Sequence, residues 1–138
     1  MHPPESPVSS LADRRWRIPA LWPTLTLLLT GAVQAASLAW PWDWPALGLA
    51  RGQALSVLQW LALGVLVLML DRSASARHAA WRGWCFALGW LSSTFAWLYI
   101  SMHTYGGLPA PLALLAVLAL AGVLAGYSAA AAWLYKRL

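Results

Sequence analysis

The sequence predicts an all-α membrane protein with four transmembrane helices, and three properties of the chain support this class. Of its 138 residues, 61% are hydrophobic and only 9% are charged, whereas a soluble domain carries charge on roughly a quarter of its residues. The few charges fall between long uncharged stretches. Within these stretches, unbroken runs of Leu, Ala and Val lack the alternation of a membrane β-barrel. The spans must therefore be helices, which satisfy their own backbone hydrogen bonds.

Four apolar stretches are long enough to cross a bilayer. At a rise of about 1.5 Å per residue, stretches of roughly 17 to 24 residues cover about 26 to 36 Å, which matches a hydrocarbon core of about 30 Å at different tilts. Proline and glycine lie between the stretches, where loops are required. The expected transmembrane domain occupies residues 20–138, with spans at residues 20–39, 54–70, 84–101 and 111–134.

The first residues of the chain differ from the rest. Residues 1–19 are rich in proline and serine and contain no apolar run, so we expect a disordered cytoplasmic tail. A cleavable signal peptide is the alternative for the first span. The basic residues from Arg14 to Arg17, the apolar run 21–33 and the small residues 35–37 would fit that pattern.

The basic residues predict the orientation of the four spans. If the helices run up and down, only Arg51 lies on one side, and the other eight basic residues lie on the opposite side: Arg14, Arg15, Arg17, Arg72, Arg77, Arg82, Lys136 and Arg137. Because cytoplasmic loops carry the excess of Lys and Arg, both termini should be cytoplasmic. The loops at residues 40–53 and 102–110 should face outside. The net charge of +5 thus indicates membrane orientation, and we expect no nucleic acid partner.

The residue types argue against several kinds of chemistry. Every acidic residue lies outside the four stretches, which disfavours a small proton-coupled transporter, since such a protein needs a carboxylate within the membrane. We find no catalytic triad, metal-ligand set, phosphate loop or dinucleotide motif. We therefore expect no catalytic residue, no metal and no cofactor in this chain. Cys85 has no His and carboxylate at usable spacing and should be a structural thiol.

Tryptophan and glycine are the residues with the clearest membrane roles. The chain has eleven tryptophans, and those near span ends should act as interfacial anchors: Trp22, Trp40, Trp42, Trp44, Trp81, Trp84 and Trp133. Three others, Trp60, Trp90 and Trp97, lie deeper and should pack between helices or line a groove for lipid. Four glycines should permit close approach of helix backbones: Gly83, Gly89, Gly122 and Gly126.

One segment resembles a known family. Residues 97–112, WLYISMHTYGGLPAPL, resemble the region between the third and fourth helices of bacterial apolipoprotein N-acyltransferases, which ends in Thr-aromatic-Gly-Gly-Leu/Met-Pro-x-Pro. Residues 83–89 are similar to the glycine-spaced start of that family's third helix, and residues 38–45 to its first outer loop. Residues 131–138 are similar to the end of its fourth helix. The resemblance runs from about residue 21 to the last residue.

The resemblance implies a multi-pass protein of the bacterial inner membrane. The family transfers an acyl chain from a phospholipid to the N-terminal diacylglyceryl-cysteine of a lipoprotein. This family works through a cysteine thioester, with a glutamate base and a lysine that stabilises the oxyanion, all in an outer nitrilase-like domain. These three residues have no counterpart in this chain, and Cys85 does not match the nucleophile. We therefore expect the chain alone to be inactive.

Two interpretations follow. The first is the N-terminal membrane part of an apolipoprotein N-acyltransferase, truncated or split, with the phospholipid bilayer, the missing C-terminal acyltransferase portion and, in the complete enzyme, the lipoprotein substrate as partners. The second is a non-catalytic four-helix membrane protein that acts as an interaction or scaffold partner. A downstream reading frame that encodes the remaining helices and a nitrilase-like region would distinguish them.

Under the first interpretation, the candidate lipid-facing or domain-docking residues face outside: Trp97, Tyr99, Ser101, His103, Thr104, Tyr105, Gly106 and Gly107. We expect Gly106 and Gly107 to form a tight turn that brings the loop against the acyl-transfer domain, while Trp97 and Tyr99 face acyl chains. His103 stands where the family has a small or aliphatic residue, so we expect no family-wide catalytic role for it. An ordinary helical hairpin with interfacial aromatic residues is the alternative.

Overall fold

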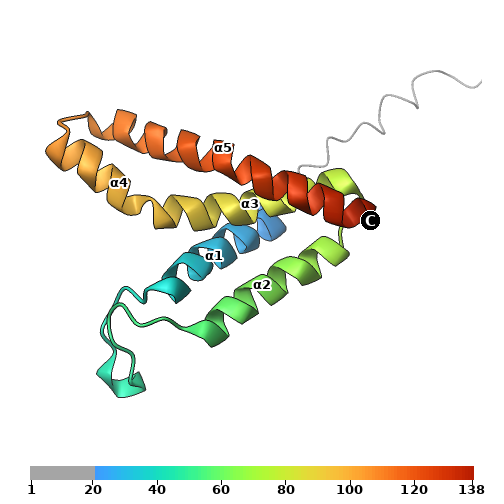
Figure 1. Ribbon diagram of the computed structural model, residues 1–138, viewed down its shortest axis with the longest axis horizontal. Helices are drawn as coiled ribbons and strands as arrows, with labels where there is room; N and C mark the ends of the chain where they lie inside the picture. Colours follow the sequence, from blue (N-terminus) through green and yellow to red (C-terminus); the bar gives the residue numbers. More distant parts are fainter. Residues whose placement is uncertain (1–20) are drawn as a thin grey trace, which may run out of the picture.

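The computed structural model describes residues 21–138, so the predicted tail at residues 1–19 lies outside the described residues. Within residues 21–138 every regular element is helical (Figure 1), which confirms the all-α class for this part of the chain. The elements are α1 (Leu21–Leu38), the 3-10 turn η2 (Pro45–Leu47), α2 (Ser56–Asp71), α3 (Ala76–Thr94), α4 (Ala96–Ile100), the π-helical turn η3 (Ser101–Tyr105) and α5 (Ala110–Arg137).

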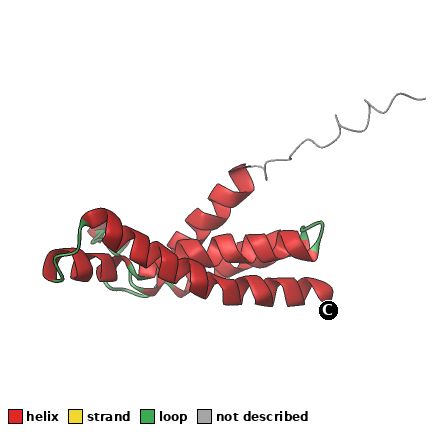
Figure 2. Cartoon of the chain, turned by 90° about the horizontal axis from the view of Figure 1, so that it is seen from above, coloured by secondary structure: helices red, strands yellow, loops and turns green. Residues whose placement is uncertain are grey.

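The long helices run back and forth between two ends of the molecule. In Figure 1 the α2–α3 connection and the C-terminus lie at one end, and the α1–α2 loop and the turn after α4 lie at the other. We call the first the basic end, because it holds Arg72, Arg77, Arg82, Lys136 and Arg137. We call the second the loop end. Figure 2 shows the start of α1 slanting away from α5.

Helix α3 lies at the centre and packs on α1 and α5. Glycine makes the α1–α3 crossing close, because a Cβ atom at Gly31 would collide with the backbone of Phe86 and Trp90. A Cβ atom at Gly89 would collide with the backbone of Leu28. On the α5 side, a Cβ at Gly83 would lie 2.7 Å from that of Ala132. This packing is the small-residue type that membrane helices use.

The predicted close-approach glycines thus differ in their surroundings. Gly83 and Gly89 lie at helix crossings, whereas a Cβ at Gly122 would make only an ordinary contact with Trp84, at 3.7 Å. The expectation for Gly126 is wrong, because its Cβ position is open space. The α1–α3 crossing instead uses Gly31, which the sequence argument did not select.

The core is small and the exterior is apolar. Leu27, Cys85 and Phe86 form one buried cluster and Leu70, Ala79 and Ala132 form another. Large apolar side chains cover the outside of the helices, among them Trp22, Val57, Trp60, Leu115 and Val123. A soluble protein rarely exposes so much contiguous apolar surface. In a bilayer these side chains face hydrocarbon.

Helix lengths support two or three of the four expected crossings. Helices α1 and α5 are each long and apolar enough to span a membrane. Helix α3 and residues Ala96–Tyr105 make a third candidate if the pair, bent by 48°, is one span. Helix α2 has 16 residues and is a shorter apolar helix. Four crossings and cytoplasmic termini stay predictions.

The third helix differs from its predicted bounds of residues 84–101. Helix α3 begins at Ala76 because Ser75 caps it, accepting a hydrogen bond from the His78 backbone N–H at 3.3 Å. It ends at Thr94 and bends into α4 at Phe95. Arg77 and Arg82 therefore lie on a helix rather than in a loop, and Arg82 reaches the end of α2.

Candidate functional site

The predicted docking segment forms a tight turn at the loop end. After α4, the π-helical turn η3 closes with a hydrogen bond from the Gly106 N–H to the Ser101 carbonyl oxygen, at 3.0 Å. Gly107 has φ +66°, a conformation that side chains other than glycine rarely adopt. A Cβ at Gly106 would lie 2.7 Å from the Met102 carbonyl oxygen. The geometry requires glycine at both positions.

His103 is held within this turn by two contacts. Its Nδ1 lies 2.8 Å from the Leu108 carbonyl oxygen, and its ring stacks on Tyr99 with centroids 5.7 Å apart. A carbonyl oxygen only accepts hydrogen bonds, so Nδ1 donates and carries a proton. The side chain thus links the middle of η3 to Leu108, the residue that precedes Pro109.

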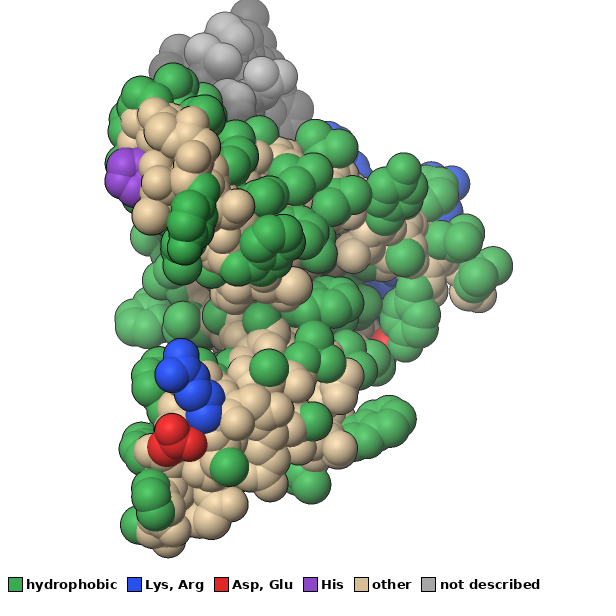
Figure 3. Space-filling view, turned by 60° about the vertical axis from the view of Figure 1, so that its left-hand side comes forward, with side chains coloured by type: hydrophobic (Ala, Val, Ile, Leu, Met, Phe, Trp, Pro, Cys, Tyr) green, Lys and Arg blue, Asp and Glu red, His purple; other side chains and the backbone are tan. Residues whose placement is uncertain are grey.

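The remaining predicted residues differ in exposure. Tyr105 is 85% exposed and Trp97 is 63% exposed, while Thr104 is exposed and Ser101 is partly buried. Within residues 21–138, no side-chain hydrogen bond joins Trp97, Thr104 or Tyr105 to another residue. Figure 3 brings this end forward and shows large hydrophobic and neutral areas with few charged side chains. The structure therefore groups Tyr99, His103 and the glycine turn, and leaves Trp97 and Tyr105 open to their surroundings.

The other segment of the loop end is the α1–α2 loop. Trp40 packs against Trp42 and Trp44, with ring centroids 5.7 and 6.0 Å apart. The Arg51 backbone N–H donates to Asp43 Oδ1 at 2.8 Å. Gly52, with φ +81°, turns the chain, and its N–H donates to the Trp40 carbonyl oxygen at 2.8 Å. The loop is therefore a folded unit with exposed indoles at its tip.

The basic end is closed by hydrogen bonds between helices. Arg82 of α3 donates to the Met69 carbonyl oxygen and to Ser73 Oγ, the latter at 3.1 Å. From α5, the Tyr135 hydroxyl donates to Asp71 Oδ1 and Lys136 Nζ donates to the Asp71 carbonyl oxygen, both at 2.8 Å. The last carbonyls of α2 need such donors, because a helix leaves them without partners.

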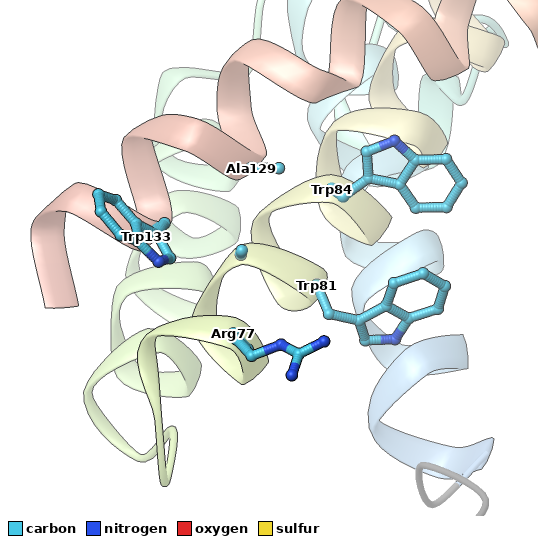
Figure 4. Close-up of a pocket in the computed structure, with 6 residues that line it drawn as sticks. Arg77, Trp81, Trp84, Ala129 and Trp133 are labelled. Carbon is cyan, nitrogen blue, oxygen red and sulfur yellow. The ribbon is translucent and has the colours of Figure 1, made fainter.

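A groove of about 380 Å³ lies between α3 and α5 at the basic end (Figure 4). It is lined by Arg77, Ala80, Trp81, Trp84, Ala129 and Trp133. The indoles of Trp81 and Trp84 stack with centroids 5.3 Å apart. The sequence argument treated the three tryptophans only as anchors. The helical spacing of residues 77, 81 and 84 on one face is a signal that could have found the α3 wall of this groove.

Nothing in the described residues resembles an active site. Cys85 is 1% exposed and lies in the core between α1 and α3. Within residues 21–138, no group of three or more His, Cys, Asp or Glu residues could hold a metal ion. The arrangement can bind lipid or another protein segment. Among the described residues, the exposed Ser75 Oγ lies 2.8 Å from His78 Nδ1, and the same Oγ caps the start of α3 by accepting from the His78 backbone N–H. This pair therefore belongs to the helix cap.

The apolar exterior, the glycine crossings and the charges at the helix ends define a helical membrane protein. Residues 35–138 match the family described as apolipoprotein N-acyltransferase N-terminal domain. The chain belongs to the apolipoprotein N-acyltransferase family, which confirms the resemblance seen in residues 97–112.

The relatives agree with this assignment. The apolipoprotein N-acyltransferase of Verminephrobacter eiseniae is 48% identical over 123 residues, which are 89% of this chain and 21% of the relative. That of Azotobacter vinelandii is 40% identical over 125 residues, 89% of this chain and 22% of the relative. That of Ralstonia nicotianae is 47% identical over 81 residues, 59% of this chain and 16% of the relative. The chain thus spans about a fifth of the length of the curated relatives it matches.

Proposed function

We propose that this chain is the N-terminal membrane part of an apolipoprotein N-acyltransferase in the bacterial inner membrane. In the complete enzyme, an acyl chain passes from a phospholipid to the N-terminal diacylglyceryl-cysteine of a lipoprotein. The observation that carries the proposal is the family match over residues 35–138. The role of this part is to build the membrane frame beneath the acyl-transfer domain.

The chain by itself carries out no acyl transfer under this proposal. The resemblance implies a cysteine nucleophile, and the one cysteine of the sequence, Cys85, is buried in the core. A thiol in that position reaches neither phospholipid nor a lipoprotein amine. Activity therefore needs the C-terminal acyltransferase portion as a partner.

The proposed topology has four crossings with both termini in the cytoplasm. The five basic residues at the basic end, with only Arg51 at the loop end among residues 21–138, support it through the positive-inside rule. Helix α2 covers about 24 Å at 1.5 Å per residue. This length crosses a bilayer that thins locally, at a cost of a fraction of a kcal/mol per Å of mismatch.

The loop end is the proposed docking surface for the acyl-transfer domain. The turn at Gly106 and Gly107 has a geometry that only glycine permits at low cost, and this supports a fixed shape for the segment. The exposure of Trp97 and the partial burial of Tyr99 support contact with acyl chains. Ser101, His103, Thr104 and Tyr105 complete the surface.

A split-enzyme complementation assay tests the function. The chain is expressed with the remaining portion of the Verminephrobacter eiseniae relative in cells depleted of their own N-acyltransferase. We expect restored N-acylation of lipoproteins, strongly reduced by Gly106→Val with Gly107→Val and unchanged by Gly126→Val, which points into open space. Full activity of the double variant would overturn the turn's role. No restoration, together with unrelated DNA downstream of Leu138, would favour a non-catalytic scaffold protein.

Cysteine labelling tests the topology. In a Cys85→Ala background, Ala46→Cys and Thr104→Cys probe the loop end and Ala74→Cys probes the basic end; all three positions are exposed. We expect an impermeant maleimide to label the first two in intact spheroplasts and the third only after lysis. The reverse pattern would contradict the orientation.

A further inference from the structure

The groove between α3 and α5 has two chemically different ends. Arg77, Trp81 and Trp84 follow each other along one face of α3 over about 10 Å. Helix α5 runs in the opposite direction, so its Ala129 and Trp133 form the facing wall. Arg77 and Trp133 lie toward the helix ends, and Trp84 lies toward the middle of the bundle. The end of the groove near the helix termini, which we call its outer end, is therefore charged. The end near the middle of the bundle is apolar.

The cations at the outer end have no acidic partner among residues 21–138. Arg77 is exposed, and the Arg137 guanidinium lies 4.3 Å from the centroid of the Trp133 ring. The described acidic residues are Asp43, at the loop end, and Asp71, whose Oδ1 accepts from Tyr135. Arg77 thus lines the groove and Arg137 lies over its Trp133 wall, and neither forms an ion pair with a described acidic residue.

The apolar end is rigid and has room for a chain. The Trp84 indole N–H donates to the Gly122 carbonyl oxygen at 3.0 Å, which fixes the ring across the two helices. Trp81 stacks on it. Between the indoles, Ala80 and Ala129 contribute only methyl groups to the floor. The volume of about 380 Å³ lies in the range of small-molecule pockets, roughly 300 to 1,000 Å³.

We propose that this groove binds one anionic phospholipid from the leaflet at the basic end. Arg77 and Arg137 hold the phosphate, and an acyl chain lies over Ala80 and Ala129 between the indoles of Trp84 and Trp133. Basic pockets between membrane helices recognise anionic headgroups in this way. A helix from a partner fits the groove less well. It would need an acidic group near the arginines, and it would have to pack on the protruding indole rings.

Native mass spectrometry of the full chain in detergent tests the proposal, with phosphatidylglycerol and phosphatidylcholine as probes. We expect one phosphatidylglycerol to bind in preference to phosphatidylcholine. Arg77→Gln with Arg137→Gln should weaken phosphatidylglycerol binding about 25-fold, since each basic residue near an anionic lipid contributes roughly fivefold. Arg72→Gln is the matched control, because Arg72 is exposed at the same end and does not line the groove.

A second variant separates the groove from general surface charge. Ala129→Leu fills the floor and keeps both arginines, so it should weaken both lipids, whereas Ala130→Leu on the exposed face should weaken neither. Equal binding of the two lipids, an Arg72→Gln effect as large as that of the double variant, or an unchanged Ala129→Leu variant would each overturn the proposal. So would a dimer that Ala129→Leu dissociates, because a second copy would then occupy the groove. Helicity by circular dichroism verifies that each variant is folded.

Discussion

The two ends of the molecule are held together in different ways. At the basic end, Arg82 of α3 and Lys136 of α5 both donate to the end of α2, so hydrogen bonds join three helices. At the loop end, the hydrogen bonds of each segment are local: the Gly52 N–H donates to Trp40 within one loop, and the Gly106 N–H donates to Ser101 within the other. No hydrogen bond joins the two segments among the described residues. The basic end is thus closed by the chain's own residues, and the loop end keeps two independent surfaces.

This difference indicates where a partner can attach. At the basic end, backbone carbonyl groups already accept hydrogen bonds from other helices, so rearrangement there would break existing bonds. Two locally folded segments with exposed indoles can settle against another domain without breaking any bond between them. Substitutions at the basic end should therefore lower the stability of the whole bundle. Substitutions at the loop end should act locally.

The largest loss of stability should come from a substitution at the α1–α3 crossing, which lies between the two ends. Gly31→Val places side-chain atoms against the backbone of Phe86 and Trp90, and forced repacking of this kind costs about 3 kcal/mol. Unfolding of detergent-solubilised protein by SDS, followed by circular dichroism, measures the loss. Gly64→Val in α2 is the control, because its Cβ meets nothing within 4 Å. Equal losses in the two variants would mean that the crossing is not the common support.

The second largest loss of stability should come from removing the hydrogen bonds that join the helices at the basic end. Arg82→Ala removes charged donors from the Met69 carbonyl oxygen and Ser73 Oγ, and bonds of this kind contribute about 2 kcal/mol. Arg72→Ala, an exposed arginine without such a bond, should change stability by less than about 0.5 kcal/mol. The same SDS titration measures both. If hydrogen exchange rises at the loop end as much as at residues 68–73, the two ends are not separate units.

The turn at the loop end should respond more weakly and only locally. Gly107→Ala puts a Cβ on a residue with φ +66°, which costs about 1 kcal/mol. Gly107→Asn should recover part of this loss, because asparagine tolerates the left-handed region. Hydrogen exchange should accelerate at residues 101–109 and stay constant at residues 68–73. A faster exchange at the basic end would break the comparison.

The smallest effect should come from the α1–α2 loop. Asp43→Ala removes the acceptor of the exposed Arg51 N–H bond and should cost less than about 1 kcal/mol. Combined with Gly107→Ala, it should give the sum of the single effects within about 0.5 kcal/mol, as for sites without shared contacts. A larger deviation would show that the two segments support each other.

The helices and the turn could be predicted from the sequence because their causes are local. Apolar runs and the Pro and Gly residues between them depend on neighbours in the chain, and the Gly106–Gly107 pair is typical of a tight turn. The bend at Phe95 has neither Pro nor Gly. There the Thr94 hydroxyl donates to the Trp90 carbonyl oxygen at 2.9 Å, a side-chain bond that often bends helices.

Contacts between helices could not be predicted, because they depend on which faces meet. Gly31 lies at a crossing and Gly126 faces open space, although both are glycines within apolar helices. The groove needs Arg77 and Trp84 from α3 with Trp133 from α5, and no single segment contains all three. The start of α3 at Ala76 depends on one capping residue, Ser75, which hydropathy does not detect.

The close α1–α3 crossing has a consequence for the order in which helices can pack during synthesis. Gly31 meets its partner backbone only after α2 and most of α3 have been made, since that backbone belongs to Phe86 and Trp90. Until α3 has been made, α2 is the only other described helix available to α1, and the contact of α1 with α2 is less extensive than that with α3. During synthesis, the close α1–α3 crossing therefore forms only after the α1–α2 hairpin has been made.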